Sequence, residues 1–448
     1  MKNKVLLLLL ILSAGLHAQT NDQGSFTLPQ AIDFALKNGY SVKNAATDIE
    51  IAKKKVAEIR GIGIPQLKTE ASFQDFVEVP VSIISANAFN PLAPPGTYLR
   101  IPFGVKYNAS IGYTASWLAF SGEYIVGLQA SKTYVDISKA NLRKSEIEVK
   151  ESVTKAYNLV LILKENKRIL SENIASLEQS IEQTSAYNKE GFVEEMDVDR
   201  LRLLKNNLST TLTTLEQQTI IAEKLLKFQM GYDVNAAITL TETLDNLISN
   251  AKSGVDVEPK FDPANNIDRI LIGKALNLQK LEVKRQKANY LPTLSTFYTW
   301  KESRITNEFD QLSNNLFRVP GGTILGVNLS MPVFQGMSQS ARVKQAKLNL
   351  KKLEVQQIQA EQGIALQSSQ SWTAYATALS GLRNTQESVG LATRIRDRAK
   401  IKYQEGVGSS LEVIQAENDL LSSQSNYINA VQQLLETRVT LDKNLNKF

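Results

Sequence analysis

The chain presents one succession of predicted elements twice, and this repeat restricts the folds that it can adopt. In each half, an amphipathic helix leads to a pair of strands, and a very long helix then meets a shorter helix that returns along it. Phe120, at the end of one strand pair, corresponds to Phe334 at an offset of 214 residues, and Gly191 corresponds to Gly406 at an offset of 215. The nearly constant offset predicts a duplicated unit that combines strands with long helices.

The predicted boundaries follow the turn residues and the period of the apolar residues. Residues 1–18 are predicted to form a signal peptide, and residues 231–262 a lateral element of strand and short helix. The first repeat, residues 19–230, is predicted to hold a helix at about 29–60, strands at about 65–78 and 103–120, a long helix at 122–188 and a return helix at 193–228. The second repeat, residues 263–448, is predicted to hold a helix at about 263–290, strands at about 292–302 and 322–334, a long helix at 336–403 and a return helix at 409–445.

Composition excludes several classes of protein. Lys2 and Lys4 flank the start of an apolar run that continues to Leu12, as in a secretory signal peptide. The chain has no cysteine, and its single histidine, His17, lies in the signal segment. A Ser/His/Asp or Cys/His catalytic site is therefore excluded. A carboxylate-only enzyme has nothing but scattered carboxylates to support it, so we expect no enzyme, no catalytic residue, no cofactor and no metal site.

Charge and hydropathy limit the partners. The net charge is +6 and is spread along the chain. The Lys53-Lys54-Lys55 run lies in a helical pattern whose apolar residues face away from it, which predicts a solvated helix face and no nucleic-acid partner. Beyond residue 18 there is no run of about 18 apolar residues, so no helix is expected to span a bilayer. A secreted chain of this kind is soluble, surface-associated or inserted as a β-barrel.

Both predicted strand pairs alternate apolar and polar residues with period two, as a sheet with two unlike faces requires. Each strand is about ten residues long or slightly more, which is the length of a tilted outer-membrane strand. Aromatic residues near the strand ends are predicted to lie at the membrane interface: Tyr113, Trp117, Phe120, Tyr298 and Trp300. The same alternation also fits an ordinary antiparallel sheet packed on a helix, and the strands alone do not decide between the two.

Four strands per chain cannot close a barrel. Open strand edges in hydrocarbon would leave backbone groups unpaired, at several kcal/mol each. If the strands span a membrane, several copies must therefore share the barrel. Three copies would supply about twelve strands and a watery lumen, whereas two copies would supply about eight and fill the lumen with side chains.

The long helices carry coiled-coil seams. In the first, Val153, Val160 and Leu177 belong to a series that steps by three and four residues, and the series continues through the return helix to Leu225. The segment between the first two strands, about 79–101, is rich in proline, which predicts a fixed, non-helical loop. Whether this loop folds inward or caps an opening stays undecided.

Three features recur in an order and spacing typical of one protein family: the motif Thr27-Leu28-Pro29-Gln30-Ala31, the strand openings at Pro65 and Pro292, and the segment from Gly406 to Glu417. Through them the mature chain resembles the TolC-type outer-membrane efflux proteins, also called outer membrane factors. The resemblance implies a homotrimer in which four antiparallel strands per chain form a 12-stranded β-barrel in the outer membrane of a Gram-negative cell. A long α-helical coiled-coil barrel would continue it into the periplasm. A periplasmic adaptor protein and an inner-membrane pump are the implied partners, beside outer-membrane lipid.

The resemblance also implies roles for the helix turns. The tip that docks the adaptor would comprise Gly191, Phe192, Val193, Gly406, Val407 and Gly408. The entrance gate would comprise Asp197, Glu412 and Gln415. Gln415 stands where some relatives have a second acid, which puts a doubled acidic ring in doubt. The acids also have an interpretation as helix-start residues, because negative charge is favoured in a first helical turn and Ser409 with Glu412 fits a capping box.

Two functional hypotheses follow. The first is a passive outer-membrane exit duct of a tripartite efflux or type I secretion system. The second is a soluble periplasmic or surface coiled-coil protein that binds partners, and it predicts strands packed beneath helices with their aromatic side chains shielded.

Overall fold

The computed structural model describes residues 24–253, 263–314 and 318–448, and these residues divide into two compact units. Unit 1 takes the described parts of Met1–Ile49, Ser138–Gly273 and Val355–Phe448, and unit 2 takes Glu50–Ile137 and Lys274–Glu354. Four helices contribute residues to both units: α3 (Tyr40–Ile62), α4 (Gly122–Lys189), α7 (Ile267–Ala288) and α8 (Ser338–Gln404). The predicted signal peptide, residues 1–18, and residues 254–262 of the predicted lateral element lie outside the described residues.

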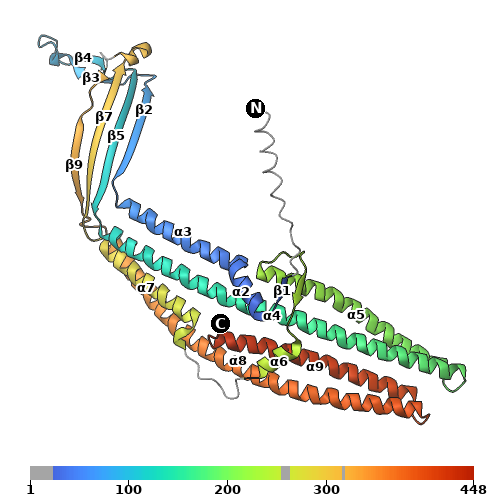
Figure 1. The fold of residues 1–448 in the computed structure, drawn as a ribbon. Helices are drawn as coiled ribbons and strands as arrows, with labels where there is room; N and C mark the ends of the chain where they lie inside the picture. Colours follow the sequence, from blue (N-terminus) through green and yellow to red (C-terminus); the bar gives the residue numbers. More distant parts are fainter. Residues whose placement is uncertain (1–23, 254–262, 315–317) are drawn as a thin grey trace, which may run out of the picture. The chain divides into compact units, whose positions relative to one another are not determined.

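Unit 1 is built mainly from two helical hairpins. In the first, α4 turns back into α5 (Glu195–Met230), and in the second, α8 turns back into α9 (Ser410–Asn444). The hairpins lie side by side, with both turns at the same end of the unit (Figure 1). Leu226, Tyr375, Leu382 and Leu434, from α5, α8 and α9, are buried in one core together with residues of α4. Burial of apolar surface between the hairpins therefore holds them together.

The predicted coiled-coil seams are buried or half-buried along both long helices. Val153, Val160 and Leu177 of α4 are among the most buried residues of the chain. The seam of α5 differs from the prediction at its end, because Leu226 is buried whereas Leu225 is exposed. The buried series of α5 therefore continues from Ala222 with a spacing of four residues instead of three, which places Leu226 on the face that packs in the core.

A lateral element packs on the middle of these hairpins. Strand β1 (Gly24–Phe26) pairs in parallel with β6 (Ile238–Leu240), and α6 (Leu244–Lys252) follows. The hydroxyl group of Tyr157 in α4 donates a 3.0 Å hydrogen bond to the carbonyl oxygen of Phe26. Burial raises the pKa of Tyr157 to about 12, so this hydroxyl remains a donor at physiological pH.

Two of the predicted helices begin or end differently in the structure. The expected helix at about 29–60 is two helices, α2 (Leu28–Asn38) and α3, because Gly39 adopts an extended ψ of 135° and interrupts the ladder. The expected helix at about 263–290 starts later, because Pro263–Asn265 form a separate 3-10 turn before α7. The capping box at the start of α2 is present, since Thr27 and Gln30 each accept from the other's backbone N–H.

Unit 2 contains an antiparallel sheet whose strands follow the order β2-β5-β7-β9. Their bounds are β2 (Gln66–Asp75), β5 (Tyr107–Phe120), β7 (Thr293–Thr306) and β9 (Thr323–Ser330). Within the described residues, β2 and β9 pair on one side only, so each has a free edge. Strand β9 is shorter than the predicted 322–334, and the residues after Ser330 leave the sheet.

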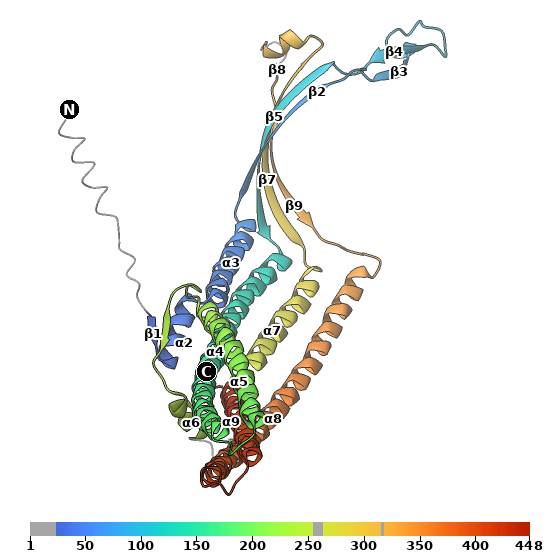
Figure 2. The same ribbon diagram turned by 90° about the vertical axis from the view of Figure 1, so that its right-hand side faces the viewer.

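The connections at the loop end of the sheet also contain structure. The Pro-rich segment includes β3 (Val81–Ser85), the 3-10 turn η1 (Ala86–Ala88) and β4 (Tyr98–Pro102), and β3 and β4 pair with each other. The other connection includes η3 (Phe309–Ser313) and β8 (Arg318–Val319), which pairs with β7. The two connections leave the sheet in different directions (Figure 2).

The strand register places like residues on like faces. Tyr113 lies opposite Trp300, and Ala115 lies between Leu67 and Tyr298, which in turn lies opposite Leu325. The apolar face of the sheet comprises Leu67, Ala71, Phe73, Ala109, Ile111, Tyr113, Ala115, Trp117, Tyr298, Trp300, Leu325, Val327 and Leu329. The polar face comprises Lys68, Glu70, Ser72, Gln74, Asn108, Ser110, Thr114, Ser116, Ser295, Thr299, Lys301 and Asn328, and it also carries the apolar residues Leu118, Phe297, Ile305 and Ile324. The alternation seen in single strands is thus kept across all four.

A bulge corrects the phase of β5 near its end. Trp117 lies on the apolar face, so simple alternation would turn Phe120 to the polar face. The register shifts by one residue between Leu118 and Phe120, which brings Phe120 opposite Leu294. Because the bulge inserts one residue, Phe120 rejoins the apolar face.

Among the described helices, none is both long enough and apolar enough to cross a membrane.

Candidate functional site

Both helical hairpins of unit 1 reverse through the same backbone motif. In the first turn, the N–H of Phe192 donates to the carbonyl of Tyr187 (2.9 Å) and that of Gly191 donates to Asn188 (3.0 Å). In the second, Val407 donates to Lys402 (3.0 Å) and Gly406 to Tyr403 (3.1 Å). These are the two hydrogen bonds of a Schellman motif, which needs a residue in the left-handed region. Gly191 and Gly406, with φ of 78° and 74°, supply it, as the sequence predicts.

The turns present apolar side chains to solvent. Phe192 is 78% exposed and Val407 is 80% exposed, and they occupy equivalent positions in the two Schellman motifs. Val193 is half-buried, and its carbonyl accepts a 2.9 Å hydrogen bond from the side chain of Asn188. Gly408 is needed for space, because a Cβ there would lie 2.9 Å from the Cβ of Lys402. The six predicted tip residues therefore form two adjoining turns with two exposed apolar side chains.

Polar contacts join the two hairpins close to the turns. The hydroxyl of Ser410, in the first turn of α9, donates to the carboxylate of Asp197, in the first turn of α5. Deeper in the unit, the hydroxyl groups of Tyr403 and Thr184 are 3.4 Å apart. The Tyr187 and Tyr403 rings meet edge to face with centroids 6.2 Å apart. Asp197 is thus placed in a contact between hairpins, and Ser410 is a partner that the sequence did not reveal.

A buried ion pair lies further from the turns. Glu417 of α9 is only 2% exposed, and its carboxylate oxygen lies 2.8 Å from the ammonium nitrogen of Lys400 in α8. The same ammonium group donates a 2.8 Å hydrogen bond to the hydroxyl of Ser176 in α4. Lys400 therefore connects both helices of the second hairpin to the first. A charge-assisted contact of this kind is stronger than a neutral one, and an unpaired Glu417 would be costly to bury.

The other two predicted gate residues, Glu412 and Gln415, lie near the start of α9. Ser409 is the N-cap, and its hydroxyl accepts a 3.2 Å hydrogen bond from the backbone N–H of Glu412. The carboxylate of Glu412 lies 3.0 Å from the ammonium nitrogen of Lys402 across the turn, which differs from the reciprocal contact of a capping box. Glu412 is therefore held at the surface by an ion pair on α8.

Asp419 extends this acidic face and was missed in the sequence. Glu412, Gln415 and Asp419 are spaced by three and four residues, so they share one face of α9. The side-chain amide of Gln415 donates a 3.1 Å hydrogen bond to Asp419. All three border a surface groove of about 690 Å³ between α8 and α9. The helical spacing from Glu412 is the sequence signal that indicates Asp419.

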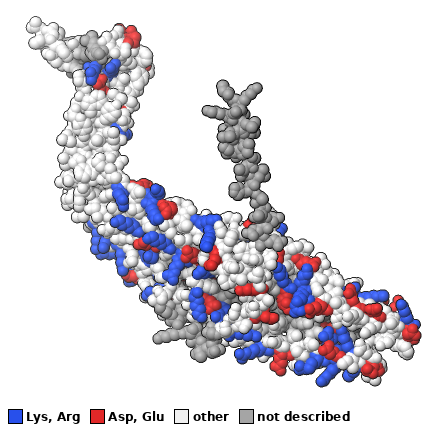
Figure 3. All heavy atoms as spheres, viewed as in Figure 1, with Lys and Arg blue, Asp and Glu red and all other residues white. Residues whose placement is uncertain are grey.

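In unit 2, the predicted interface aromatics lie on the apolar face of the sheet. Tyr113, Trp117, Phe120 and Tyr298 are each between 40% and 46% exposed, and Trp300 is half-buried. The rings of Tyr113 and Trp300 stack with centroids 5.6 Å apart. The face of the sheet seen in Figure 3 is almost free of charged atoms, whereas the helices carry both signs of charge. The shielded sheet that the soluble alternative predicts is not what the structure shows.

A second aromatic group marks the loop end of the same face. Phe309 of η3 packs on Phe73 and Tyr107 with centroids 6.0 Å and 5.5 Å away. Tyr107 and Trp117 lie ten residues apart on β5. That separation is about 33 Å along a strand and about 25 Å across a membrane at a typical tilt, which is the height of an outer-membrane apolar band. The sequence gave no reason to group Phe309 with these strands, because the contact depends on how the connection folds.

Two charged residues on the apolar face have polar partners within unit 2. Glu302 lies 2.7 Å from the guanidinium group of Arg318 in β8. Arg304 donates hydrogen bonds of 3.1 Å to the carbonyl oxygens of Leu312 and Ser313. The connection between β7 and β9 thus supplies the partners that these groups need when water is withdrawn.

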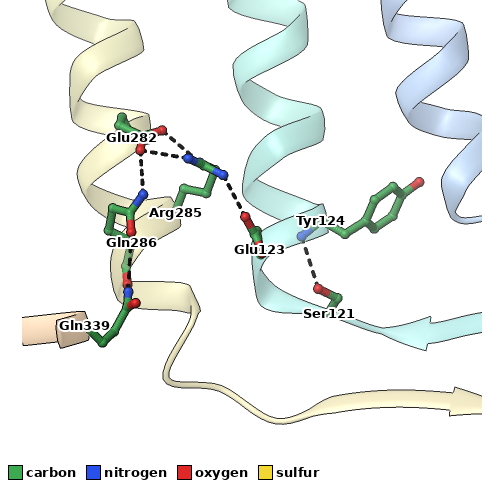
Figure 4. Close-up of polar contacts among 7 residues, drawn as sticks. All are labelled: Ser121, Glu123, Tyr124, Glu282, Arg285, Gln286 and Gln339. Atoms are coloured by element: carbon green, nitrogen blue, oxygen red, sulfur yellow. Dashed lines mark hydrogen bonds and ion pairs between the residues drawn. The ribbon is translucent and has the colours of Figure 1, made fainter. Parts of the chain in front are cut away.

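A polar network fixes the ends of the helices that adjoin the strands (Figure 4). Arg285 of α7 reaches the carboxylate of Glu123 at the start of α4 (2.6 Å) and that of Glu282 one turn earlier (2.8 Å). Gln286 donates to Glu282 (2.7 Å), and its own backbone carbonyl accepts a 2.5 Å hydrogen bond from Gln339 of α8. Hydrogen bonds from Arg285 lower the pKa of Glu282. Three helix ends are thereby joined by side chains.

Among the residues that the structure describes, no group of three or more His, Asp or Glu side chains is placed to hold a metal ion. The hydroxyl groups near the turns contact an ammonium group at Lys400, a second hydroxyl group at Thr184 and a carboxylate at Asp197. What the arrangement offers is binding surface at the turns and a two-faced sheet.

Comparison with known proteins gives a consistent result. Residues 275–447 match the model of the family described as outer membrane efflux protein. The chain is 21% identical over 427 residues to the outer membrane protein TolC of Salmonella enteritidis, and the aligned region covers 90% of this chain and 82% of TolC. It is 19% identical over 402 residues to the outer membrane efflux protein BepC of Brucella suis biovar 1 (strain 1330), with coverage of 89% and 81%.

Solved structures share the fold. The outer membrane protein VceC from Vibrio cholerae superposes with a TM-score of 0.68 at 15% identity, covering 93% of this chain and 95% of VceC. The family model thus matches the C-terminal part of the chain, and TolC, BepC and VceC are each named as outer membrane proteins.

Alanine at either turn glycine is expected to destabilise the protein. At Gly191 and Gly406 an added Cβ meets no atom within 4 Å, so only the positive φ opposes it. We expect Gly191→Ala and Gly406→Ala each to cost about 1 kcal/mol. Gly363→Ala is the matched control, because Gly363 lies inside α8 with equally open space, and we expect it to raise stability by about 0.5–1 kcal/mol. Thermal unfolding followed by circular dichroism checks the order, and equal shifts at all three positions would contradict it.

Removing the charge of Glu282 is expected to lower the stability of the protein near neutral pH and not at acidic pH. The pKa of Glu282 is lowered by Arg285, so its contribution is present above the unfolded pKa and is lost as pH falls through the folded pKa. Both partners are about one-third exposed, so we expect Glu282→Gln to cost roughly 0.5–1 kcal/mol near pH 7. The difference from the parent in thermal midpoint should shrink as pH falls below the unfolded pKa of about 4.3 and vanish once pH is below the folded pKa.

The exposed i,i+3 pair of Lys55 and Glu58 provides the control, and Glu58→Gln should leave the midpoint unchanged. A loss at Glu282 that persists unchanged at low pH would show that the carboxylate charge is not the cause.

Proposed function

We propose that three copies of this chain form a passive duct through the outer membrane, as part of a tripartite efflux or type I secretion system. The observation that carries the proposal is the four-stranded sheet, with an apolar face, a polar face and two free edges. In the assembly, the apolar face lies against lipid and the polar face lines a watery lumen. The energy for transport comes from an inner-membrane pump.

The free edges support an assembly of several copies. An unpaired strand edge in hydrocarbon costs several kcal/mol per backbone group, and the edges of β2 and β9 are unpaired within the described chain. Pairing β2 of one copy with β9 of the next would satisfy both edges. Each half of the sequence repeat contributes two strands, so each chain contributes four. Three copies then supply about twelve strands, and a barrel of that size leaves room for water in its lumen.

Chemistry at the strand ends supports membrane insertion. The two aromatic groups of the apolar face, around Phe73 and around Trp117, are separated by about the height of an outer-membrane band. Strands β5 and β9 contain no charged residue. Residues with a polar edge on an apolar ring are favoured at such interfaces.

The turn end of unit 1 would be the periplasmic entrance, where the adaptor docks. Gly191, Phe192 and Val193 of one turn and Gly406, Val407 and Gly408 of the other would form the contact. Support comes from Phe192 and Val407, which expose apolar side chains at equivalent positions. Residues of this type anchor protein interfaces when a partner covers them.

The gate would be formed by groups close to the same end. Asp197 with Ser410 would hold the two hairpins together in the closed state. Glu412, Gln415 and Asp419 would line the entrance and favour cations, because a ring of carboxylates from three copies concentrates negative potential. Asp419 would supply the second acidic level that Gln415 does not.

The duct is tested by particle mass and lipid contact. We expect native mass spectrometry of detergent-solubilised protein to give a trimer. In a Trp372→Phe background, only Trp117 and Trp300 remain, and lipid-borne bromine should quench their fluorescence because the apolar face meets acyl chains. A monomer in plain buffer whose tryptophans resist lipid quenchers would support the soluble coiled-coil alternative.

The gate is tested by ion selectivity in planar bilayers. We expect Glu412→Gln and Asp419→Asn each to reduce the preference for cations over anions, and the double variant to reduce it further. Glu58→Gln serves as the control, because Glu58 is an exposed helix residue of unit 2 with an ion pair of its own. Unchanged selectivity in the double variant would remove both acids from the gate.

A further inference from the structure

The Pro-rich connection of unit 2 is a β-ribbon that continues the sheet. After β2 and β5 separate, the N–H of Phe76 still donates to Lys106 (2.8 Å), and the N–H of Phe103 donates to Pro80 (2.9 Å). Strands β3 and β4 then pair from Val81 opposite Pro102 to Ser85 opposite Tyr98. We call residues 77–103 the outer ribbon. It extends from β2, which is a free edge of the sheet.

The outer ribbon exposes an unusual amount of apolar surface. Val77 and Leu92 are 90% and 92% exposed. Other large apolar side chains of the ribbon that are exposed are Val81, Ile83, Phe89, Tyr98, Leu99 and Phe103. Both faces of the two strands therefore carry apolar residues without cover in the described chain, and Figure 2 shows the ribbon directed away from η3. A lone two-stranded ribbon is only marginally stable in water, so its apolar faces need a partner.

Charge indicates which partner fits. Glu78 and Arg100 are the only charged residues of the outer ribbon, one of each sign. Attachment to an anionic membrane surface relies on lysine and arginine beside the apolar residues, and the ribbon has no basic cluster of that kind. Identical ribbons, in contrast, can approach one another closely without like-charge repulsion.

Position indicates the same partner. A neighbouring copy that pairs with the free edge of β2 must lie beside the strand from which the outer ribbon extends. The ribbon therefore continues along the boundary between copies. Three ribbons related by a threefold axis would then meet through the same apolar residues.

We propose that the outer ribbon is a contact surface between copies of this chain, in which the apolar residues around Leu92 and Ile83 pack on the ribbons of neighbouring copies. The inference rests on the proposed trimer and adds a second contact to it, beyond the strand edges. In a single chain these side chains are exposed to solvent, and their burial between copies would stabilise the ribbons.

Single cysteines test the contact directly, because the chain has no cysteine of its own. Leu92→Cys and Asn87→Cys place a thiol at two exposed positions of the ribbon, and Lys54→Cys places one on the exposed face of α3 as the control. Each variant is purified in lipid nanodiscs, its mass is measured, and it is treated with a short bismaleimide. We expect most of the protein to become covalent dimer or trimer at one or both ribbon positions, and the control to remain monomeric on a denaturing gel.

The other outcomes are separated by the same samples. A trimer that cross-links at neither ribbon position overturns the inference and leaves the proposed duct intact. Quenching of a bimane label at position 92 by brominated lipid shows that lipid covers the ribbon, and it also overturns the inference. A monomeric mass contradicts the duct itself, and the ribbon contact falls with it.

Discussion

The register between the four strands of unit 2 is the constraint on which the function depends. Alternation within one strand sorts residues onto two sides, but only correct pairing gathers them into continuous faces. Here Thr69, Tyr113 and Trp300 form one row across β2, β5 and β7, and Lys68, Thr114 and Thr299 form the next row on the other face. A slip of one residue between any two strands would mix the rows. The separation of lipid-compatible from water-compatible surface is therefore a property of the pairing.

Unit 1 depends on a different principle. Its hairpins are held by apolar burial along the seams, with polar contacts at the turn end and a buried ion pair at Lys400 and Glu417. Apolar seams resist separation along the whole length of the hairpins, whereas hydrogen bonds such as that from Ser410 to Asp197 are local and can be exchanged for water. The turn end is thus the place where the hairpins can part with the least loss of stability.

Sequence reasoning succeeded where a local rule decides the structure. The long helices, the two glycine turns with positive φ and the alternation of the strands each follow from neighbouring residues. It failed where the structure depends on contacts between distant residues. The sequence predicts one continuous helix through Gly39, whereas the structure divides it there into α2 and α3. The sequence predicts a loop where β3 and β4 form a ribbon.

The site was predicted to a similar extent. The tip glycines and Asp197 were named from the resemblance to a known family, whereas Ser410, the partner of Asp197, could not be found because the two residues are 213 positions apart. Phe309 joined the aromatic face only through the fold of its connection. Asp419 is a different case, since helical spacing from Glu412 would have revealed it.

The bulge between Leu118 and Phe120 has a consequence for how this chain can vary. It brings the ring of Phe120 onto the same face as Trp117. Strict alternation would place two residues that are three positions apart on opposite faces. Loss of a single residue at this point would straighten the strand without moving the ring across the sheet. Loss of one residue anywhere between Tyr107 and Trp117 would instead move every side chain on one side of the deletion to the opposite face of the sheet. The bulge is therefore the one place along β5 where evolution can delete a single residue and still keep apolar residues on one face of the sheet and polar residues on the other.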